Sequence, residues 1–187
     1  DRLEADNKEL AEAVEYRAVK KFEKVVPEID LTTANNVANL GVNGLEITTN
    51  KGGGSWYSAF LKTKLQGRQS FEVEILTVSS NGIMIGVGSE SLRNLASCYS
   101  NAESVCWYPN GSTVYFEAKS KSLTMNVTNG DRIIVKVDRI DNTVEWRFTH
   151  PFQSRIVKIV LPNSMRDKTL YPMVNMIGSY NDKIRFI

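Results

Sequence analysis

The stretch NGDRIIVKVDRIDNTVEWRF, residues 129–148, decides the fold class of this 187-residue chain. Within it, residues 133–137 and 144–148 alternate apolar and polar side chains with a period of two, which is typical of half-buried β-strands. Asp141 and Asn142 lie between the two runs, and a short polar connection of this kind joins the strands of a hairpin. The stretch therefore predicts two antiparallel strands that each bury one face.

Further segments with strand character follow one another from Ile29 onward, and turn signals such as Asn81-Gly82 separate them. They are residues 45–49, 56–64, 71–75, 83–87, 114–118, 155–160, 171–176 and 183–187. Short strands at this spacing are typical of an antiparallel sandwich or barrel. Because no helix alternates with the strands, a doubly wound α/β fold is disfavoured. We therefore expect an all-β antiparallel β-sandwich.

The first 24 residues have a different composition, rich in Glu, Ala, Lys and Leu and without Gly or Pro, which favours a helix. Leu3, Leu10 and Val14 place an apolar stripe on one face of this helix. We therefore divide the chain into an N-terminal helix at residues 1–24 and a sandwich at residues 25–187. Two interpretations stay open: the helix packs on its own domain, or it is the end of a coiled coil through which the chain dimerises or assembles.

The charge balance and the cysteine count limit the kinds of partner. The formal net charge is +2, which is too balanced to attract nucleic acid by bulk charge. No apolar run is long enough to span a bilayer, so we expect no membrane insertion. Cys98 and Cys106 are too few for a disulfide framework, so we expect a cytoplasmic, intracellular protein, with their pairing left open. The chain begins with Asp1 rather than methionine, so we expect a fragment of a longer protein.

The sequence shows no recognisable catalytic machinery. The single histidine, His150, precedes Pro151 in an expected turn, where a solvated surface role is the more common one. No spacing of His or Cys matches a zinc site. Residues 52–55 lack the Lys-Ser/Thr ending of a phosphate loop, and Glu72 and Glu74 are interpreted as a solvated outer face of a strand. We therefore expect no enzyme, no cofactor and no metal site.

Several sequence elements stand in the order that is typical of one known family. They are Phe71-Glu72-Val73-Glu74-Ile75, Ile85-Gly86-Val87-Gly88, Cys106-Trp107-Tyr108-Pro109-Asn110-Gly111, residues 129–138 with their Gly-Asp step, Val144-Glu145-Trp146-Arg147-Phe148 and Leu170-Tyr171-Pro172-Met173-Val174. Through these elements residues 29–187 resemble a SPRY domain, and the order of helix and domain is similar to that of TRIM-type proteins. The resemblance implies a concanavalin-like sandwich that recognises a protein or short peptide without catalysing a reaction.

The resemblance also implies where a partner binds. SPRY domains of the SPRY/SOCS-box group bind short extended peptides in a shallow pocket lined by loops at one end of the sandwich. The matching positions of this sequence are Tyr99, Ile177, Gly178, Ser179 and Tyr180. Residues 177–180 take the place of a hydrophobic-Trp-Gly step, and because the Trp is absent we expect a different peptide preference.

The tryptophans leave alternatives open. Trp56 is ambiguous between core and site, and we include it among the candidate partner-binding residues. Trp107 and Trp146 lie within or beside apolar alternation, so we expect them in the core. If the sandwich instead binds carbohydrate, Trp56, Trp107 or Tyr108 would stack on sugar rings. If the chain is a structural scaffold, the N-terminal helix would hold the sandwich in a larger assembly.

Overall fold

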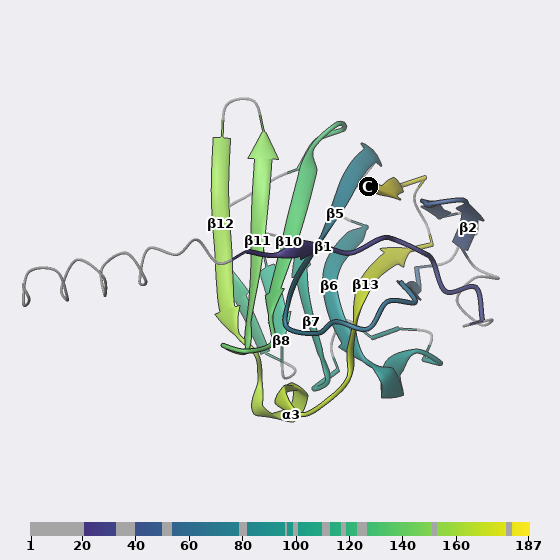
Figure 1. Cartoon of the computed structure of the whole chain (residues 1–187). Coiled ribbons are helices and arrows are strands. Elements are labelled where there is room, and N and C mark those ends of the chain that lie inside the picture. Colours follow the sequence, from purple (N-terminus) through teal and green to yellow (C-terminus); the bar gives the residue numbers. More distant parts are fainter. Residues whose placement is uncertain are drawn as a thin grey trace, which may run out of the picture.

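The structure is a computed structural model that describes residues 21–32, 40–49, 54–78, 82–95, 97–98, 101–109, 113–116, 119–122, 127–150, 153–178 and 181–187. In this part of the chain, mostly antiparallel strands form two sheets, as Figure 1 shows. The two sheets share one apolar core. The prediction of an antiparallel β-sandwich is therefore confirmed.

The first sheet has eight strands in the order β12-β11-β10-β5-β14-β3-β2, and β1 pairs in parallel with β5 beside this path. Its strands are β1 (Glu23–Lys24), β2 (Leu40–Asn43), β3 (Glu46–Thr49), β5 (Arg68–Thr77), β10 (Arg132–Asp138), β11 (Thr143–His150), β12 (Gln153–Val160) and β14 (Lys183–Phe186). The two ends of the path, β12 and β2, are the edges of the sheet.

The second sheet has six strands in the order β4-β13-β6-β7-β8-β9. Its strands are β4 (Trp56–Phe60), β6 (Ile83–Ser89), β7 (Ser104–Tyr108), β8 (Thr113–Phe116), β9 (Lys119–Ser122) and β13 (Leu170–Ile177). Two single helical turns, η1 (Glu90–Leu92) and α3 (Asn163–Arg166), lie in connections between strands. Neither these turns nor any other described segment forms a helix that is long and apolar enough to cross a membrane.

The hairpin predicted from residues 129–148 is formed by β10 and β11. Val135 pairs with Trp146, and Val137 pairs with Val144, so the apolar residues of both strands point to the same side of the sheet. Asn142 in the connecting turn has a φ of 51°, a left-handed conformation that Asn tolerates better than most residues. The period-two pattern of the sequence therefore places the apolar side chains of this hairpin in the core.

The space between the two sheets holds a continuous apolar core. Trp107 of β7 and Trp146 of β11 are fully buried in it, which confirms the prediction that both pack in the core. The Trp146 indole Nε1 donates a hydrogen bond of 2.9 Å to the Ile85 carbonyl oxygen of β6. This bond satisfies the buried indole donor and joins the two sheets.

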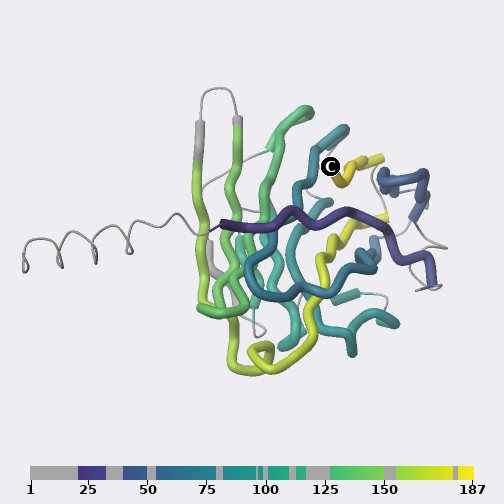
Figure 2. Tube along the Cα trace, viewed as in Figure 1, coloured from purple at the N-terminus to yellow at the C-terminus, as the bar shows by residue number. Residues whose placement is uncertain are grey.

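The described chain begins on the first sheet, and Figure 2 traces this start in purple. Glu23 and Lys24 form β1 beside β5, and Val25 N donates a hydrogen bond of 2.7 Å to Ser70 O. The predicted helix is therefore wrong for Glu23 and Lys24, because pairing with β5 outweighs their local helix preference. Residues 1–20, which hold the rest of the predicted helix, lie outside the described residues.

Candidate partner-binding face

One side of the second sheet faces away from the core. Because side chains alternate along a strand, core-facing residues such as Ile85, Val105 and Val174 leave their neighbours on the outer side. These outer positions are Trp56, Ser58 and Phe60 of β4, Tyr171, Met173, Asn175 and Ile177 of β13, Met84 of β6, Ser104, Cys106 and Tyr108 of β7, and Thr113 and Tyr115 of β8. We name this set the aromatic face. None of its side chains is Asp, Glu, Lys or Arg.

The connection between β6 and β7 covers part of the aromatic face. Leu92 and Cys98 of this connection are buried in a second apolar cluster, together with Phe60, Met84 and Met173 from the sheet. This cluster is separate from the core between the sheets. The aromatic face therefore has a closed part under the connection and an open part where side chains remain partly exposed.

Polar contacts hold the two ends of this connection together. Ser89 N donates a hydrogen bond of 3.0 Å to Glu103 O, and the Ser89 and Ser91 hydroxyls each donate to the Glu103 carboxylate at 2.5 Å. These two hydroxyl bonds, with a smaller contribution from Lys168, hold the pKa of Glu103 below its ordinary value. The connection is therefore closed into a loop at its base.

The Arg93 side chain fastens the same connection to the rest of the domain. Arg93 forms an ion pair with the buried carboxylate of Asp30, and its guanidinium lies 4.2 Å from the centroid of the Tyr171 ring. Asp30 N in turn donates a hydrogen bond of 2.8 Å to Phe60 O of β4. A buried charge is stable only when it is paired and hydrogen-bonded, so these contacts hold the connection in one position over the sheet.

A fully buried amide lies beneath the connection. Asn175 Oδ1 accepts hydrogen bonds from the Ser58 hydroxyl and from Cys98 N, the latter at 3.4 Å. Asn175 Nδ2 donates to Cys106 Sγ at 3.3 Å. One side chain thus satisfies polar groups from β4, β7 and the connection, and it ties all three to β13.

Cys98 and Cys106 are free, buried thiols. Burial raises the pKa of Cys98 to about 11, and burial together with the nearby Cys98 raises the pKa of Cys106 further still. Because the thiolate is the nucleophilic and metal-binding form, neither cysteine is a reactive nucleophile near neutral pH. Across the described ranges, no group of three or more His, Cys, Asp or Glu side chains is arranged to hold a metal ion.

Three partly exposed aromatic rings form the open part of the aromatic face. The rings of Trp56 and Tyr108 pack edge to face, with centroids 5.7 Å apart and planes at 89°. The Tyr115 ring follows, 6.4 Å from that of Tyr108 with an interplanar angle of 36°. Trp56 lies on β4 and Tyr108 on β7, so the two side chains meet above the intervening strands β13 and β6. We name these three residues the aromatic group.

The structure brings three of the predicted partner-binding residues together beside the aromatic group. Ile177 of β13 is the cross-strand partner of Trp56 in β4, and Gly178 N donates a hydrogen bond of 3.0 Å to Ser55 O. A Cβ atom at Gly82 would lie 2.1 Å from Asp182 Oδ2 and 2.9 Å from Ile177 Cγ2, so the glycine leaves room for both side chains. Trp56, Ile177 and Gly178 therefore occupy one end of the aromatic face.

The other three predicted residues, Tyr99, Ser179 and Tyr180, lie outside the described residues. Cys98, which precedes Tyr99 in the sequence, is buried against the aromatic face, and Gly178 lies at the end of β13. A role for the three remaining residues in a site stays a prediction.

Sequence reasoning missed part of the aromatic group. Tyr115 was not identified, and Tyr108 was considered only as a sugar-stacking residue. The alternation of Val114, Tyr115 and Phe116 could have placed Tyr115 on the outer side, but its closeness to Trp56 depends on the order of the strands. The alternative in which Trp107 stacks on a sugar is wrong, because Trp107 is fully buried in the core.

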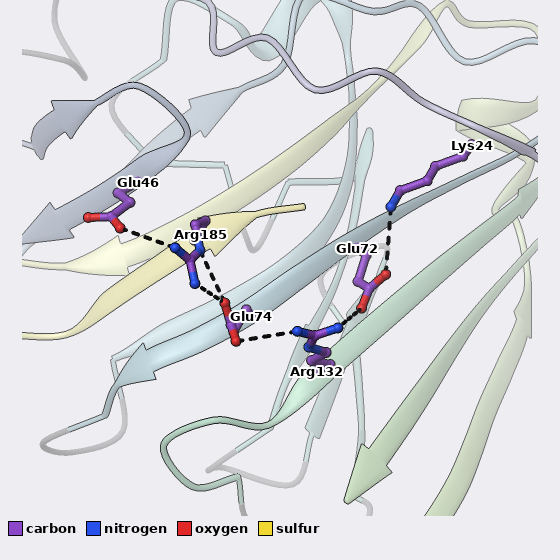
Figure 3. A network of polar contacts seen from close by, with 6 residues as sticks. All are labelled: Lys24, Glu46, Glu72, Glu74, Arg132 and Arg185. Carbon is purple, nitrogen blue, oxygen red and sulfur yellow. Dashed lines mark hydrogen bonds and ion pairs between the residues drawn. The ribbon is translucent and has the colours of Figure 1, made fainter.

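The outer side of the first sheet, which we name the charged face, has the opposite character. Its ion-pair network, drawn in Figure 3, consists of Lys24, Glu46, Glu72, Glu74, Arg132 and Arg185. Arg132 lies 3.7 Å from the carboxylates of both Glu72 and Glu74, and Arg185 donates to Glu74 at 2.5 Å. Glu72 and Glu74 thus lie on an outer face as predicted, but they are ion-paired, with side chains only 19% and 14% exposed.

Comparisons with known proteins agree with this fold. No family model matches the chain, and no curated protein matches its sequence. Among solved structures, the chain is similar to the SPRY domain of human HERC1, with 17% identity and a TM-score of 0.62 over 78% of this chain and 89% of that chain. It is also similar to the TRIM65 PSpry domain, with 11% identity and a TM-score of 0.68 over 88% of this chain and 93% of that chain.

A further human SPRY domain is similar at 17% identity and a TM-score of 0.55, over 79% of this chain and 94% of that chain. These identities are low, so the likeness concerns the fold, and it spans nearly the full length of each of these SPRY domains. The order of sequence elements, the two-sheet sandwich and these solved structures lead to the same result: this chain has the fold of a SPRY domain.

Proposed function

We propose that this chain is a non-catalytic module that recognises a protein or a short peptide through the open part of the aromatic face. The aromatic group is the observation that supports the proposal, because Trp56, Tyr108 and Tyr115 are partly exposed among strand positions that carry no Asp, Glu, Lys or Arg. The charged Arg93 contacts Tyr171 in the part of the face that the connection covers. The centres of protein interfaces are enriched in Trp and Tyr and depleted of charge. A partner that covers these rings would bury apolar area without desolvating an ion.

The proposed site extends from the aromatic group to the end of β13. Ile177 and Gly178 belong to it because they lie beside Trp56. Tyr99, Ser179 and Tyr180 belong to it through the resemblance to SPRY domains that bind peptides with the loops at one end of the sandwich.

A protein or peptide fits this face better than a carbohydrate does. A sugar needs placed polar groups for its hydroxyls as well as a ring on which to stack. Three polar side chains of the aromatic face, Ser58, Ser104 and Asn175, are fully buried and hydrogen-bonded within the protein, so none of them faces an incoming ligand. The polar groups on its open part are hydroxyls of Thr113, Tyr108 and Tyr115 and the Trp56 indole. The scaffold alternative rests on residues 1–20, which lie outside the described residues.

The two cysteines support a non-catalytic role in a reducing compartment. The raised pKa values of Cys98 and Cys106 leave both thiols protonated at neutral pH, so neither supplies a nucleophile. Free thiols are ordinary in intracellular proteins, whereas secreted domains more often pair them. We infer an intracellular site of action from this chemistry.

A pull-down from cell lysate tests the proposal with three forms of the chain. The wild type is compared with a Trp56→Ala/Tyr108→Ala double variant and with Phe22→Ala, a matched control whose ring lies over Lys136 on the charged face. Because truncation of interface aromatics removes about 2 kcal/mol or more, we expect the double variant to lose at least about tenfold in partner recovery. The control variant should recover partners as the wild type does.

Thermal unfolding checks that each variant is folded, and Trp56→Leu replaces the double variant if that one is unfolded. Full partner recovery by a folded aromatic variant would reject the aromatic face as the site. A separate Tyr99→Ala/Tyr180→Ala variant tests the residues assigned by resemblance, and unchanged recovery with it would confine the site to the aromatic group and the end of β13.

A further inference from the structure

Among the described strands, β12 is the longest strand at a sheet edge. The other edge strands, β2, β4 and β9, have four, five and four residues, whereas β12 has eight. It pairs only with β11 in the described part of the chain, and Figure 1 shows it at the outer end of the first sheet. An edge strand presents a row of backbone N–H and C=O groups to an incoming strand, and short length is one common protection against such pairing.

Exposed apolar side chains gather at this edge. Ile156 and Val160 of β12 are 56% and 60% exposed. Both lie on the outer side of the sheet, on either side of Lys158, because alternate residues of a strand share a face. Large apolar side chains that cluster at an open strand edge are a feature of surfaces that bind another chain.

The charges on the outer side of this edge alternate from strand to strand. Lys136 of β10 lies directly opposite Glu145 of β11, which lies directly opposite Lys158 of β12. Arg147 Nε donates to the Glu145 carboxylate at 2.5 Å. Lys158 is exposed and forms no ion pair with any residue that the structure describes. The row of alternating charges, Lys136, Glu145 and Lys158, therefore ends at the edge strand with a lysine that has no ion-pair partner among the described residues.

We propose that β12 binds an extended peptide strand with apolar, acidic and apolar residues at alternate positions, which adds to the first sheet. The acidic side chain would lie opposite Lys158 and continue the alternation of charge. The apolar side chains would lie opposite Ile156 and Val160 and cover them. Because this pattern is symmetric about Lys158, it holds for parallel and for antiparallel addition.

Charge selects this partner over the alternatives. The described side chains of β12 include the cations Arg155 and Lys158 and no carboxylate, so a basic strand would be repelled. A second copy of this chain, paired through β12 itself, would add two further cations to the edge without supplying a carboxylate. The site is separate from the aromatic face, since it lies on the other sheet.

Fluorescence anisotropy with a labelled peptide tests the inference. The probe is the capped peptide Thr-Val-Thr-Glu-Thr-Val-Thr. One control peptide carries Lys in place of Glu. The other carries Pro in place of both the first Val and the Thr after it, because the Val N–H faces β12 in antiparallel addition and the Thr N–H faces it in parallel addition. The proteins are the full chain, its Lys158→Glu variant and the matched variant Lys64→Glu, which makes the same charge change at an exposed site after β4. Lys158→Ala serves as a second variant if Lys158→Glu is unfolded.

We expect Lys158→Glu to weaken binding of the acidic peptide about three- to tenfold and to strengthen binding of the Lys peptide by a similar factor. Lys64→Glu should change either affinity by less than about twofold, because surface charges at a distance are screened by salt. The Pro peptide should bind least, since proline cannot donate to the sheet.

Three results would overturn the inference. One is no binding of the acidic peptide to the full chain at about 1 mM. Another is equal binding of the Pro peptide, which would show that the peptide does not add as a strand. The third is a wild-type dimer in sedimentation that Lys158→Glu dissociates, because a second copy would then occupy the edge.

Discussion

The aromatic face and the charged face are both outer sides of antiparallel sheets, yet their chemistry is opposite. On the charged face, Arg132 of β10 contacts both Glu72 and Glu74 of β5, and all three side chains remain partly exposed. On the aromatic face, the connection between β6 and β7 covers a second apolar cluster, and the aromatic group stays partly exposed beside it. The first face is satisfied by its own ion pairs and water. Covering more of the aromatic face would still lower the free energy, because its partly exposed rings would leave water.

This difference shows which outer face favours a partner. Covering the charged face would require the desolvation of several ions, and the attraction within surface ion pairs is too weak to offset that cost. Covering the aromatic group removes apolar ring surface from water, which is favourable in proportion to the area. Substitutions on each face test this difference.

The largest effect is expected from Phe60→Ala. Phe60 is fully buried in the cluster beneath the connection, so its truncation removes apolar contacts and leaves a cavity. We expect the free energy of unfolding to fall by about 3–5 kcal/mol in urea titrations. Ile156→Ala is the control from an outer position of the first sheet, and it should change stability by less than about 1 kcal/mol. Equal effects of the two substitutions would contradict the presence of a second core.

An intermediate effect is expected from Cys98→Ala at alkaline pH. The pKa of Cys98 is raised from 9.0 to about 11 by burial, so the unfolded chain loses this proton first as the pH rises. The corresponding stabilisation is complete below about pH 9 and is lost as the pH rises toward about 11. Urea titrations at about pH 8 and pH 10 should therefore show a smaller loss of stability for Cys98→Ala than for the wild type. Parallel losses in both chains would show that this thiol is not buried.

The smallest effect is expected from Glu72→Gln on the charged face. Glu72 lies 3.7 Å from Arg132 and 4.0 Å from Lys24, and both cations are more than half exposed. We expect a loss of less than about 1 kcal/mol that shrinks further in about 1 M salt. A loss above about 2 kcal/mol that persists in salt would mean that the charged face is a structural core, and the comparison would fail.

The strands that alternate in sequence were predictable because alternation is a local property. Residues 133–137 and 144–148 appear within β10 and β11 with the expected face in the core. β9 was missed because Lys and Ser alternate in it without an apolar residue. β2 was missed because Gly41 and Asn43 are poor strand formers.

β7 was missed as a strand for a reason that concerns the site. Its residues Ser104–Tyr108 are buried on both sides, so the run does not alternate. β6 and β13 show the same continuous burial, since the connection covers their outer side. Near-continuous apolar runs are typical of strands covered on both faces, and this signal could have predicted that the second sheet is covered on its outer side.

Which side chains share a face follows from the local sequence, because a period of two is built into every extended strand. Alternation also predicted that Glu72 and Glu74 lie on an outer face, whereas Ile177 and Gly178 were assigned to a candidate site through the resemblance to SPRY domains. The contact between Trp56 and Tyr108 depends instead on tertiary structure, because it spans two strands and requires the strand order β4-β13-β6-β7. That order arises from pairings between distant segments, which no local pattern encodes. The same long-range pairing left β12 at the end of the first sheet, with β11 as its one partner among the described strands.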